Sequence, residues 1–126
     1  MKKLIAFLFL FFNLFFTNIN ATLYNPVKEI ETKLVVLSLS NISMYGEKDF
    51  VLITAKSEVG NKIFILEISP RWFLKEEFFE RVKPNLKIHV LGSLAKENWI
   101  VVRKISIGGY SVELRTKQGF PLWRVK

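Results

Sequence analysis

The chain has 126 residues, of which 50% are hydrophobic and none is cysteine. Its 19 Lys and Arg residues outnumber its 11 Asp and Glu residues, which gives a formal net charge of +8 at pH 7. The lack of cysteine excludes disulfides, cysteine nucleophiles and a lipid-modified cysteine at a mature N-terminus, and a single histidine excludes the usual zinc ligand sets.

The first 21 residues have the layout of a secretory signal peptide. Lys2 and Lys3 precede an apolar run over residues 4–16, and a polar stretch then ends at the small residue Ala21. We therefore predict cleavage after Ala21 and export to the periplasm or the extracellular space. An uncleaved membrane anchor is the alternative, because Ile19 is bulky for a cleavage site. The apolar run would reach only about 20 Å, however, against a hydrocarbon core of about 30 Å.

The rest of the chain is long enough for one domain. Without Lys2 and Lys3 it carries 17 basic against 11 acidic residues, a net charge of +6. Residues 22–33 are polar and contain Pro26, so we predict a lead-in segment there and a single folded domain over residues 34–126. The positive charge is dispersed, with no run of five or more basic residues, which is more typical of a solubilising surface than of a nucleic-acid footprint.

Three short runs rich in β-branched, leucine and aromatic residues begin this domain. Residues 34–40 predict a first strand, residues 50–56 a second and residues 62–68 a third. Residues 44–49 are expected to form the loop between the first two strands, and Val59-Gly60-Asn61 the turn between the second and the third.

The spacing of the apolar residues changes after Pro70. Apolar residues then recur at intervals of three and four, with charged residues between them, which predicts an amphipathic helix of about ten residues. These apolar residues are Phe73, Leu74, Phe78, Phe79 and Val82. The helix is expected to stop at Lys83-Pro84-Asn85.

Two further strands are predicted at residues 86–92 and 99–107. A tight Gly-Gly turn leads into a sixth strand at residues 110–115, and a turn at residues 117–119 leads into a closing segment at residues 120–123. These last runs form a predicted C-terminal hairpin.

This order of elements is that of the OB-fold. We predict a mainly β protein: an OB-fold-like five-stranded Greek-key barrel with one helix between strands 3 and 4 and an extra C-terminal hairpin. The pattern leaves two alternatives open, a small β-sandwich with one helix and an SH3-like barrel, which normally lacks so definite a helix.

Two segments contain sequence motifs that also occur in other proteins. Residues 68–73 read strand end, proline, tryptophan and a further aromatic residue before the helix. Residues 107–123 read paired glycines, an apolar strand ending in Leu-Arg, and Gly-x-Pro-x-Trp. Together with Lys83-Pro84-Asn85, where Asn replaces the more usual Gly, they resemble a group of small exported bacterial OB-fold proteins of unassigned function. The resemblance spans most of residues 34–124; it implies the fold and supplies no catalytic or binding residue.

The side chains offer no set of catalytic groups. His89 lies in the middle of a predicted strand, and no serine lies in a strained Gly-x-Ser-x-Gly turn. Asp49 is the sole aspartate and is not clustered with other carboxylates, while Glu76, Glu77 and Glu80 fall on the polar side of the predicted helix. We therefore predict a protein that is not an enzyme and that binds no metal or cofactor.

An aromatic and basic surface is predicted where OB-folds usually bind ligands. That surface combines the loop between strands 1 and 2, the loop between strands 4 and 5, and the face of strands 2 and 3. The candidate ligand-binding residues are Tyr45, Lys48, Lys56, Trp99 and Arg103, with Lys96 nearby.

The two other tryptophans are expected to be structural. Trp72 and Phe73 follow Pro70 and are expected to cover the open end of the barrel, and Trp123 is expected to pin the C-terminus onto the barrel wall.

We expect an exported module that binds a protein, a peptide or a small ligand of the cell envelope. The alternative is a binder of single-stranded nucleic acid or another polyanion, held by stacking on aromatic rings beside basic residues. Membrane contact is expected only through the leader, if it is retained.

Overall fold

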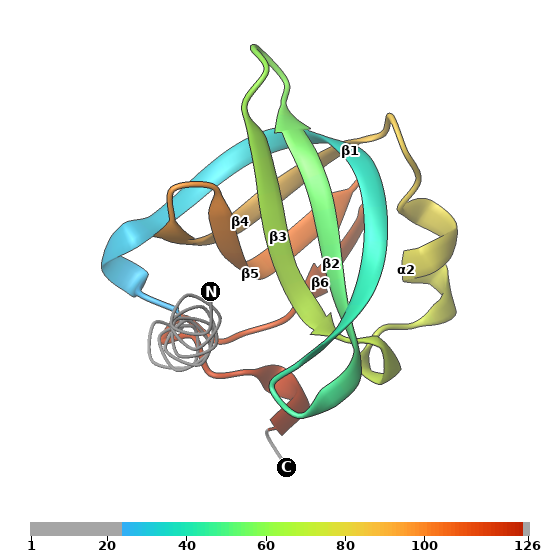
Figure 1. Ribbon diagram of the computed structural model, residues 1–126, viewed down its shortest axis with the longest axis vertical. Coiled ribbons are helices and arrows are strands. Elements are labelled where there is room, and N and C mark those ends of the chain that lie inside the picture. Colours follow the sequence, from blue (N-terminus) through green and yellow to red (C-terminus); the bar gives the residue numbers. More distant parts are fainter. Residues whose placement is uncertain (1–23, 125–126) are drawn as a thin grey trace, which may run out of the picture.

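The computed structural model describes residues 24–124, which form a mainly β structure with six strands and one α-helix (Figure 1). The predicted leader, residues 1–21, lies outside the described residues. In chain order the elements are the 3₁₀ turn η1 (Pro26–Lys28), β1 (Glu29–Met44), β2 (Glu47–Ser57), β3 (Ile63–Pro70), the 3₁₀ turn η2 (Arg71–Phe73), α2 (Glu76–Arg81), β4 (Lys87–Lys96), β5 (Trp99–Ile107), β6 (Tyr110–Glu113) and the 3₁₀ turn η3 (Leu122–Arg124).

The strands form one sheet in the order β3-β2-β1-β4-β5-β6, and β3 also pairs with β5. The β3–β5 pairing is parallel and places Ile65 beside Trp99 and Glu67 beside Val101, whereas the other pairings are antiparallel. Each of β1 to β4 therefore has two neighbouring strands and β5 has three, so the pairings β3-β2-β1-β4-β5 end where they began, at β3. The predicted mainly β class, with its helix between the third and fourth strands, is confirmed.

β1 is much longer than the predicted first strand. Residues 29–35 pair with β4 and residues 34–44 pair with β2, so one curved strand joins two parts of the sheet (Figure 1). It takes in residues 29–33, which we expected in the lead-in segment. These residues become strand because β4 supplies backbone partners, a tertiary contribution that local sequence does not reveal.

The predicted loop at residues 44–49 is shorter in the structure. β1 ends at Met44 and β2 begins at Glu47, so only Tyr45 and Gly46 form the turn. Both residues have positive φ, 55° and 79°, as in a type I′ hairpin turn. Such a turn fixes the register of the two strands and holds Tyr45 at the tip of the hairpin.

The predicted ten-residue helix is divided in two. The 3₁₀ turn η2 is followed by extended backbone at Leu74 and Lys75, and α2 then covers only Glu76–Arg81. Leu74 lies within this break and Phe78 lies in α2. Both pack in the larger cluster of buried apolar side chains, which we call the main core. The prediction of one continuous helix was wrong in extent, because tertiary burial overrode the local helical period.

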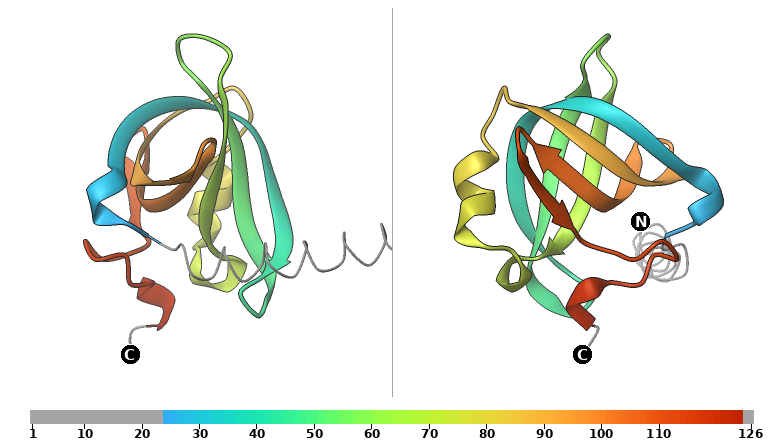
Figure 2. Two further views of the ribbon diagram at one scale, coloured as in Figure 1. Left: turned by 60° about the vertical axis from the view of Figure 1, so that its left-hand side comes forward. Right: turned by 180° about the vertical axis from the view of Figure 1, so that it is seen from behind.

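The C-terminal residues differ most from the prediction. β6 ends at Glu113, and residues 120–123 form no strand. The backbone N–H groups of Leu114 and Arg115 both donate to one carbonyl of β5, and both side chains are buried. We call residues 114–124 the C-terminal segment. Within it Arg115 and Pro121 form an isolated antiparallel β-bridge, and the segment ends with η3 beside the β1–β2 turn (Figures 1 and 2).

Buried apolar side chains lie on both faces of β2. Val51 and Ile53 belong to the main core, whereas Phe50 and Leu52 point to the opposite face. There they form, with Met44, a second cluster that we call the outer cluster. Its partly buried surroundings are Tyr45, Ile65, Trp99 and Trp123. A strand buried on both faces explains the near-continuous apolar run of residues 50–55.

Candidate functional site

A buried carboxylate lies beside the outer cluster. Glu67 is on β3 and is 1% exposed. Its Oε1 accepts hydrogen bonds from the Tyr45 hydroxyl and from Nε1 of Trp99, each over 3.0 Å. Its Oε2 accepts from Nη2 of Arg115 over 3.1 Å. The turn between β1 and β2, the start of β5 and the C-terminal segment thus meet at one side chain.

Arg115 completes the sheet where two strands separate. The parallel β3–β5 pairing ends at Glu67 and Val101, and the Arg115 guanidinium lies just beyond this point. Its Nη1 donates to the backbone carbonyls of Glu67 (3.4 Å), Ile68 (3.1 Å) and Val102. The guanidinium therefore bonds to the backbone of both β3 and β5.

Burial dominates the electrostatics of this network. It raises the pKa of the Glu67 carboxyl, against the effects of the Arg115 charge and of the hydrogen bonds from Trp99 and Tyr45. It also lowers the pKa of Arg115, against the charge of Glu67. The pKa of Tyr45 is raised well above its ordinary 10.0, first by burial and then by Glu67. Two charges this deeply buried are stable only as a pair.

The polar atoms of this network bond to one another and to the backbone. Every buried side-chain nitrogen and oxygen among residues 24–124 has a hydrogen-bond partner. Because the bonds of Glu67 run to side chains of the fold itself, this arrangement is that of a structural network. Its role is to join β3, β5 and the C-terminal segment.

The structure brings together only two of the five predicted ligand-binding residues. Tyr45 and Trp99 meet at Glu67, with their polar atoms directed to its carboxylate. Lys48 and Lys56 are both exposed on β2, but they lie eight residues apart, roughly 26 Å along a strand.

The remaining predicted residue, Arg103, is on β5. Its Nη1 lies 2.8 Å from Oε2 of Glu29 in a partly buried ion pair. Lys96, which we placed nearby, is the last residue of β4.

Trp72 does not cover the core as we expected. It is 64% exposed, and its Nε1 donates to Oε1 of Glu47 over 3.0 Å. The neighbouring Phe73 takes the covering role, because it packs against the main core and lies 5.9 Å from the Trp123 ring. The expectation for Trp123 is confirmed, since its ring also lies 5.9 Å from the ring of Phe50.

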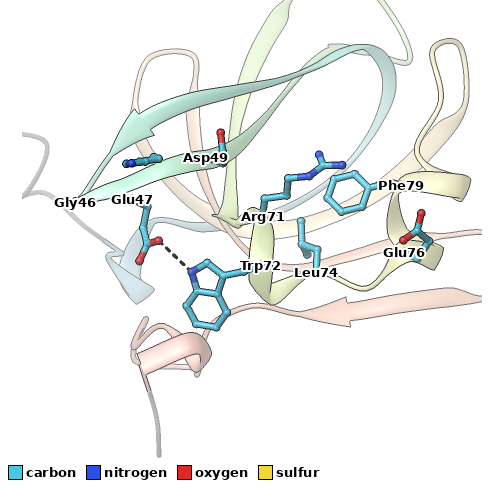
Figure 3. Close-up of a pocket in the computed structure, with 9 residues that line it drawn as sticks. Gly46, Glu47, Asp49, Arg71, Trp72, Leu74, Glu76 and Phe79 are labelled. Atoms are coloured by element: carbon cyan, nitrogen blue, oxygen red, sulfur yellow. Dashed lines mark hydrogen bonds between the residues drawn. The ribbon is translucent and has the colours of Figure 1, made fainter.

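A surface groove of about 570 Å³ lies beside Trp72 (Figure 3). The start of β2, η2 and α2 provide its walls, and the guanidinium carbon of Arg71 lies 4.1 Å from the centre of the Phe79 ring. Three carboxylates and two basic side chains line it. We call this surface the Trp72 groove; its residues include Glu47, Lys48, Asp49, Arg71, Trp72, Glu76 and Phe79.

Sequence reasoning missed the Trp72 groove because its parts are distant in the chain. Glu47 and Trp72 are 25 residues apart, and no local motif connects them. The one available signal was Trp72 itself, a large aromatic residue among charged neighbours.

Two further grooves occur in the described part of the chain. One, of about 520 Å³, lies between the η1 region and the β4–β5 turn, and includes the exposed Val27. The other, of about 310 Å³, is lined by Lys33, Lys87 and His89 among others. Nε2 of His89 lies 3.6 Å from a carboxylate oxygen of Glu31.

Metal binding and membrane spanning receive no support from residues 24–124. Within this range no three His, Asp or Glu side chains gather as a metal-binding group, and no helix is both long and apolar enough to cross a membrane. Comparisons with known protein families, with curated proteins and with solved structures found no match.

Proposed function

We propose that this chain is an exported, non-enzymatic binding module that holds a protein, a peptide or a small envelope ligand in the Trp72 groove. The observation that carries the proposal is the exposure of Trp72, at 64%, beside a groove of about 570 Å³. Tryptophan is strongly enriched at the energetic centres of protein interfaces.

Trp72 is also held in one orientation. Its indole N–H is bonded to Glu47, and its ring meets that of Phe73 edge to face with centroids 6.3 Å apart. A side chain that is already ordered loses less conformational entropy on binding. The mixture of carboxylates and basic groups around it suits a polar chain, such as a peptide, better than an apolar ligand.

We further propose that the sheet is an OB-fold-like Greek-key barrel. Two observations support this. The pairing of β3 with β5 closes the series β3-β2-β1-β4-β5, and α2 lies between β3 and β4 in the chain. In such a barrel the outer face of β2 and β3 is a usual ligand surface. Here Trp123 of the C-terminal segment packs against that face through Phe50, which favours the Trp72 groove as the binding site.

Export and the absence of catalysis are parts of the same proposal. Export rests on the leader-like residues 1–21. The proposal of no catalysis rests on the three hydrogen bonds that the Glu67 carboxylate accepts from the fold and on the surroundings of His89, whose Nε2 lies 3.6 Å from a carboxylate oxygen of Glu31.

Selection of random peptides on the immobilised protein tests the groove directly. Enriched peptides would be titrated against the wild type, Trp72→Ala and Val59→Ala, a matched change at an apolar residue that is 90% exposed. We expect Trp72→Ala to weaken binding by about tenfold or more, as for a central interface residue. Val59→Ala should bind like the wild type. Equal affinity of all three proteins would contradict binding in the groove.

A second function, polyanion binding, is favoured by one observation. Lys33, Lys87 and His89 line the groove of about 310 Å³, with Glu58 as an opposing charge. Binding of single-stranded nucleic acid there would weaken steeply with added salt, and Lys33→Glu would weaken it further. Binding that salt leaves unchanged would exclude this function.

A further inference from the structure

One edge of β1 has no neighbouring strand over half of its length. Residues 34–44 pair with β2 along one edge, while the opposite edge pairs with β4 only as far as Val35. Val36 still exchanges backbone hydrogen bonds with Asn85 and Leu86. From residue 37 to residue 43, no backbone hydrogen bond on this edge joins it to any residue within 24–124. We call residues 37–43 the open edge.

The open edge is accessible and uncharged. Ser38 and all residues from 40 to 43 are exposed. Residues 34–44 contain no Lys, Arg, Asp, Glu, Pro or Gly. Folded proteins usually protect free strand edges with charges or proline, because an unprotected edge is a template for another strand.

Other free edges of this sheet carry the usual protection. Residues 47–49, at the start of β2, have no partner on β3 and read Glu-Lys-Asp. β6 has only four residues, and its last residue is Glu113. The open edge lacks this protection, and pairing with another strand is the interaction that it fits.

We propose that two copies of this chain pair antiparallel through their open edges. The open edge itself suits a second copy as the partner. Although each chain carries a net positive charge, two open edges meet without bringing charged side chains together. Antiparallel pairing about a two-fold axis also needs one surface only, since each copy supplies the same strand. With Ser40 at the centre of the open edge, the pairing places it opposite the partner's Ser40.

A single introduced thiol tests this pairing. The chain has no cysteine, so Ser40→Cys and Asn41→Cys each provide a unique reactive group near the expected axis. Residues directly opposed in antiparallel strands have Cα atoms about 4.5–5.5 Å apart, within the range that a disulfide bridges. We expect mild oxidation to yield a disulfide-linked dimer from at least one of them. Val59→Cys, on an exposed hairpin, should remain monomeric. Equal cross-linking at residue 59, or none at residues 40 and 41, would overturn the proposal.

A charge at the same position provides an independent test without oxidation. Ser40→Lys would place two ammonium groups opposite each other, which destabilises strand pairing. Light scattering of the concentrated wild type should report a dimer, and Ser40→Lys a monomer with an unchanged circular dichroism spectrum. Ser111→Lys, on the exposed edge strand β6, is the matched control and should remain dimeric. A monomeric wild type at its highest soluble concentration contradicts the pairing.

Discussion

The same hydrogen bond occurs in two very different surroundings in this protein. Nε1 of Trp99 donates to Oε1 of Glu67 over 3.0 Å, and Nε1 of Trp72 donates to Oε1 of Glu47 over 3.0 Å. Glu67 is 1% exposed, whereas Trp72 is 64% exposed. Water can replace either partner of the exposed bond, whereas the Glu67 carboxylate is almost fully shielded from it. The contact geometry is therefore the same, and burial decides that one bond stabilises the fold while the other only orients a ring.

The position of each bond in the sheet explains the difference in burial. Glu67 lies in the part of β3 that pairs with both β2 and β5, and the C-terminal segment covers it. Glu47 lies at the first residue of β2, before the pairing with β3 begins at Phe50. The exposed bond is thus outside the region that the C-terminal segment protects, and the Trp72 groove is open to a partner.

The strongest test of the comparison is Arg115→Met. This change leaves the Glu67 carboxylate buried without its counter-charge and removes a donor from three backbone carbonyls. Breaking a buried pair in this way costs about 3–5 kcal/mol, and we expect a loss of that order in urea unfolding. The double variant with Glu67→Gln should recover part of the loss, since the uncompensated charge is gone. A loss below about 1 kcal/mol would show that the network is not structural.

A smaller effect is expected from Trp99→Phe. The ring remains, but Oε1 of Glu67, a side chain that is 1% exposed, loses one of its two donors. Leaving a buried acceptor partly unsatisfied costs about 1–3 kcal/mol, measurable in the same urea experiment. Stability equal to that of the wild type would show that the Trp99 hydrogen bond, like that of Trp72, does not stabilise the fold.

Stability at alkaline pH tests the buried Glu67 network through Tyr45, which donates a hydrogen bond to Glu67. Its pKa is raised above 10.0 by burial and by Glu67, so the unfolded chain releases this proton before the folded protein does. The stability contribution is complete below pH 10 and is lost as the pH rises through the raised pKa. Tyr45→Phe should flatten this decline, as followed by urea midpoints below and above pH 10. Some decline should remain, because burial also raises the pKa of Tyr24. An identical decline in stability for the wild type and the variant would show that the Tyr45 hydroxyl does not contribute to it.

The smallest effect on stability is expected from Trp72→Phe, the matched change at the exposed bond. Surface substitutions usually alter the free energy of unfolding by no more than about 0.5 kcal/mol, and Nε1 of Trp72 has only an exposed partner. The same variant should nevertheless weaken the binding of peptides selected on the groove. A loss of stability comparable to that of Trp99→Phe would remove the distinction between the two sites.

Sequence reasoning identified most elements and few of the contacts. The fifth strand was predicted with its observed bounds, Trp99–Ile107, because β-branched residues and turns mark it clearly. Trp99 and Tyr45 were singled out as large aromatic residues near turns, and they do meet. The sequence could not reveal that both are directed at Glu67, because a lone glutamate in an apolar strand carries no local sign of its partner 48 residues later.

By itself the sequence determined the class of the protein: mainly β, with one helix after the third strand and a positive net charge. These features follow from local periodicity, turn residues and composition, which act over a few neighbouring residues. Only the tertiary structure decided the length of β1, the break between η2 and α2, and which tryptophan donates to a buried carboxylate. Each of these depends on partners distant in the chain: β4 for residues 29–33, the main core for Leu74, and Glu67 and Arg115 for Trp99. Burial is a property of the assembled chain, and here it decides which residues support the fold and which remain available to a partner.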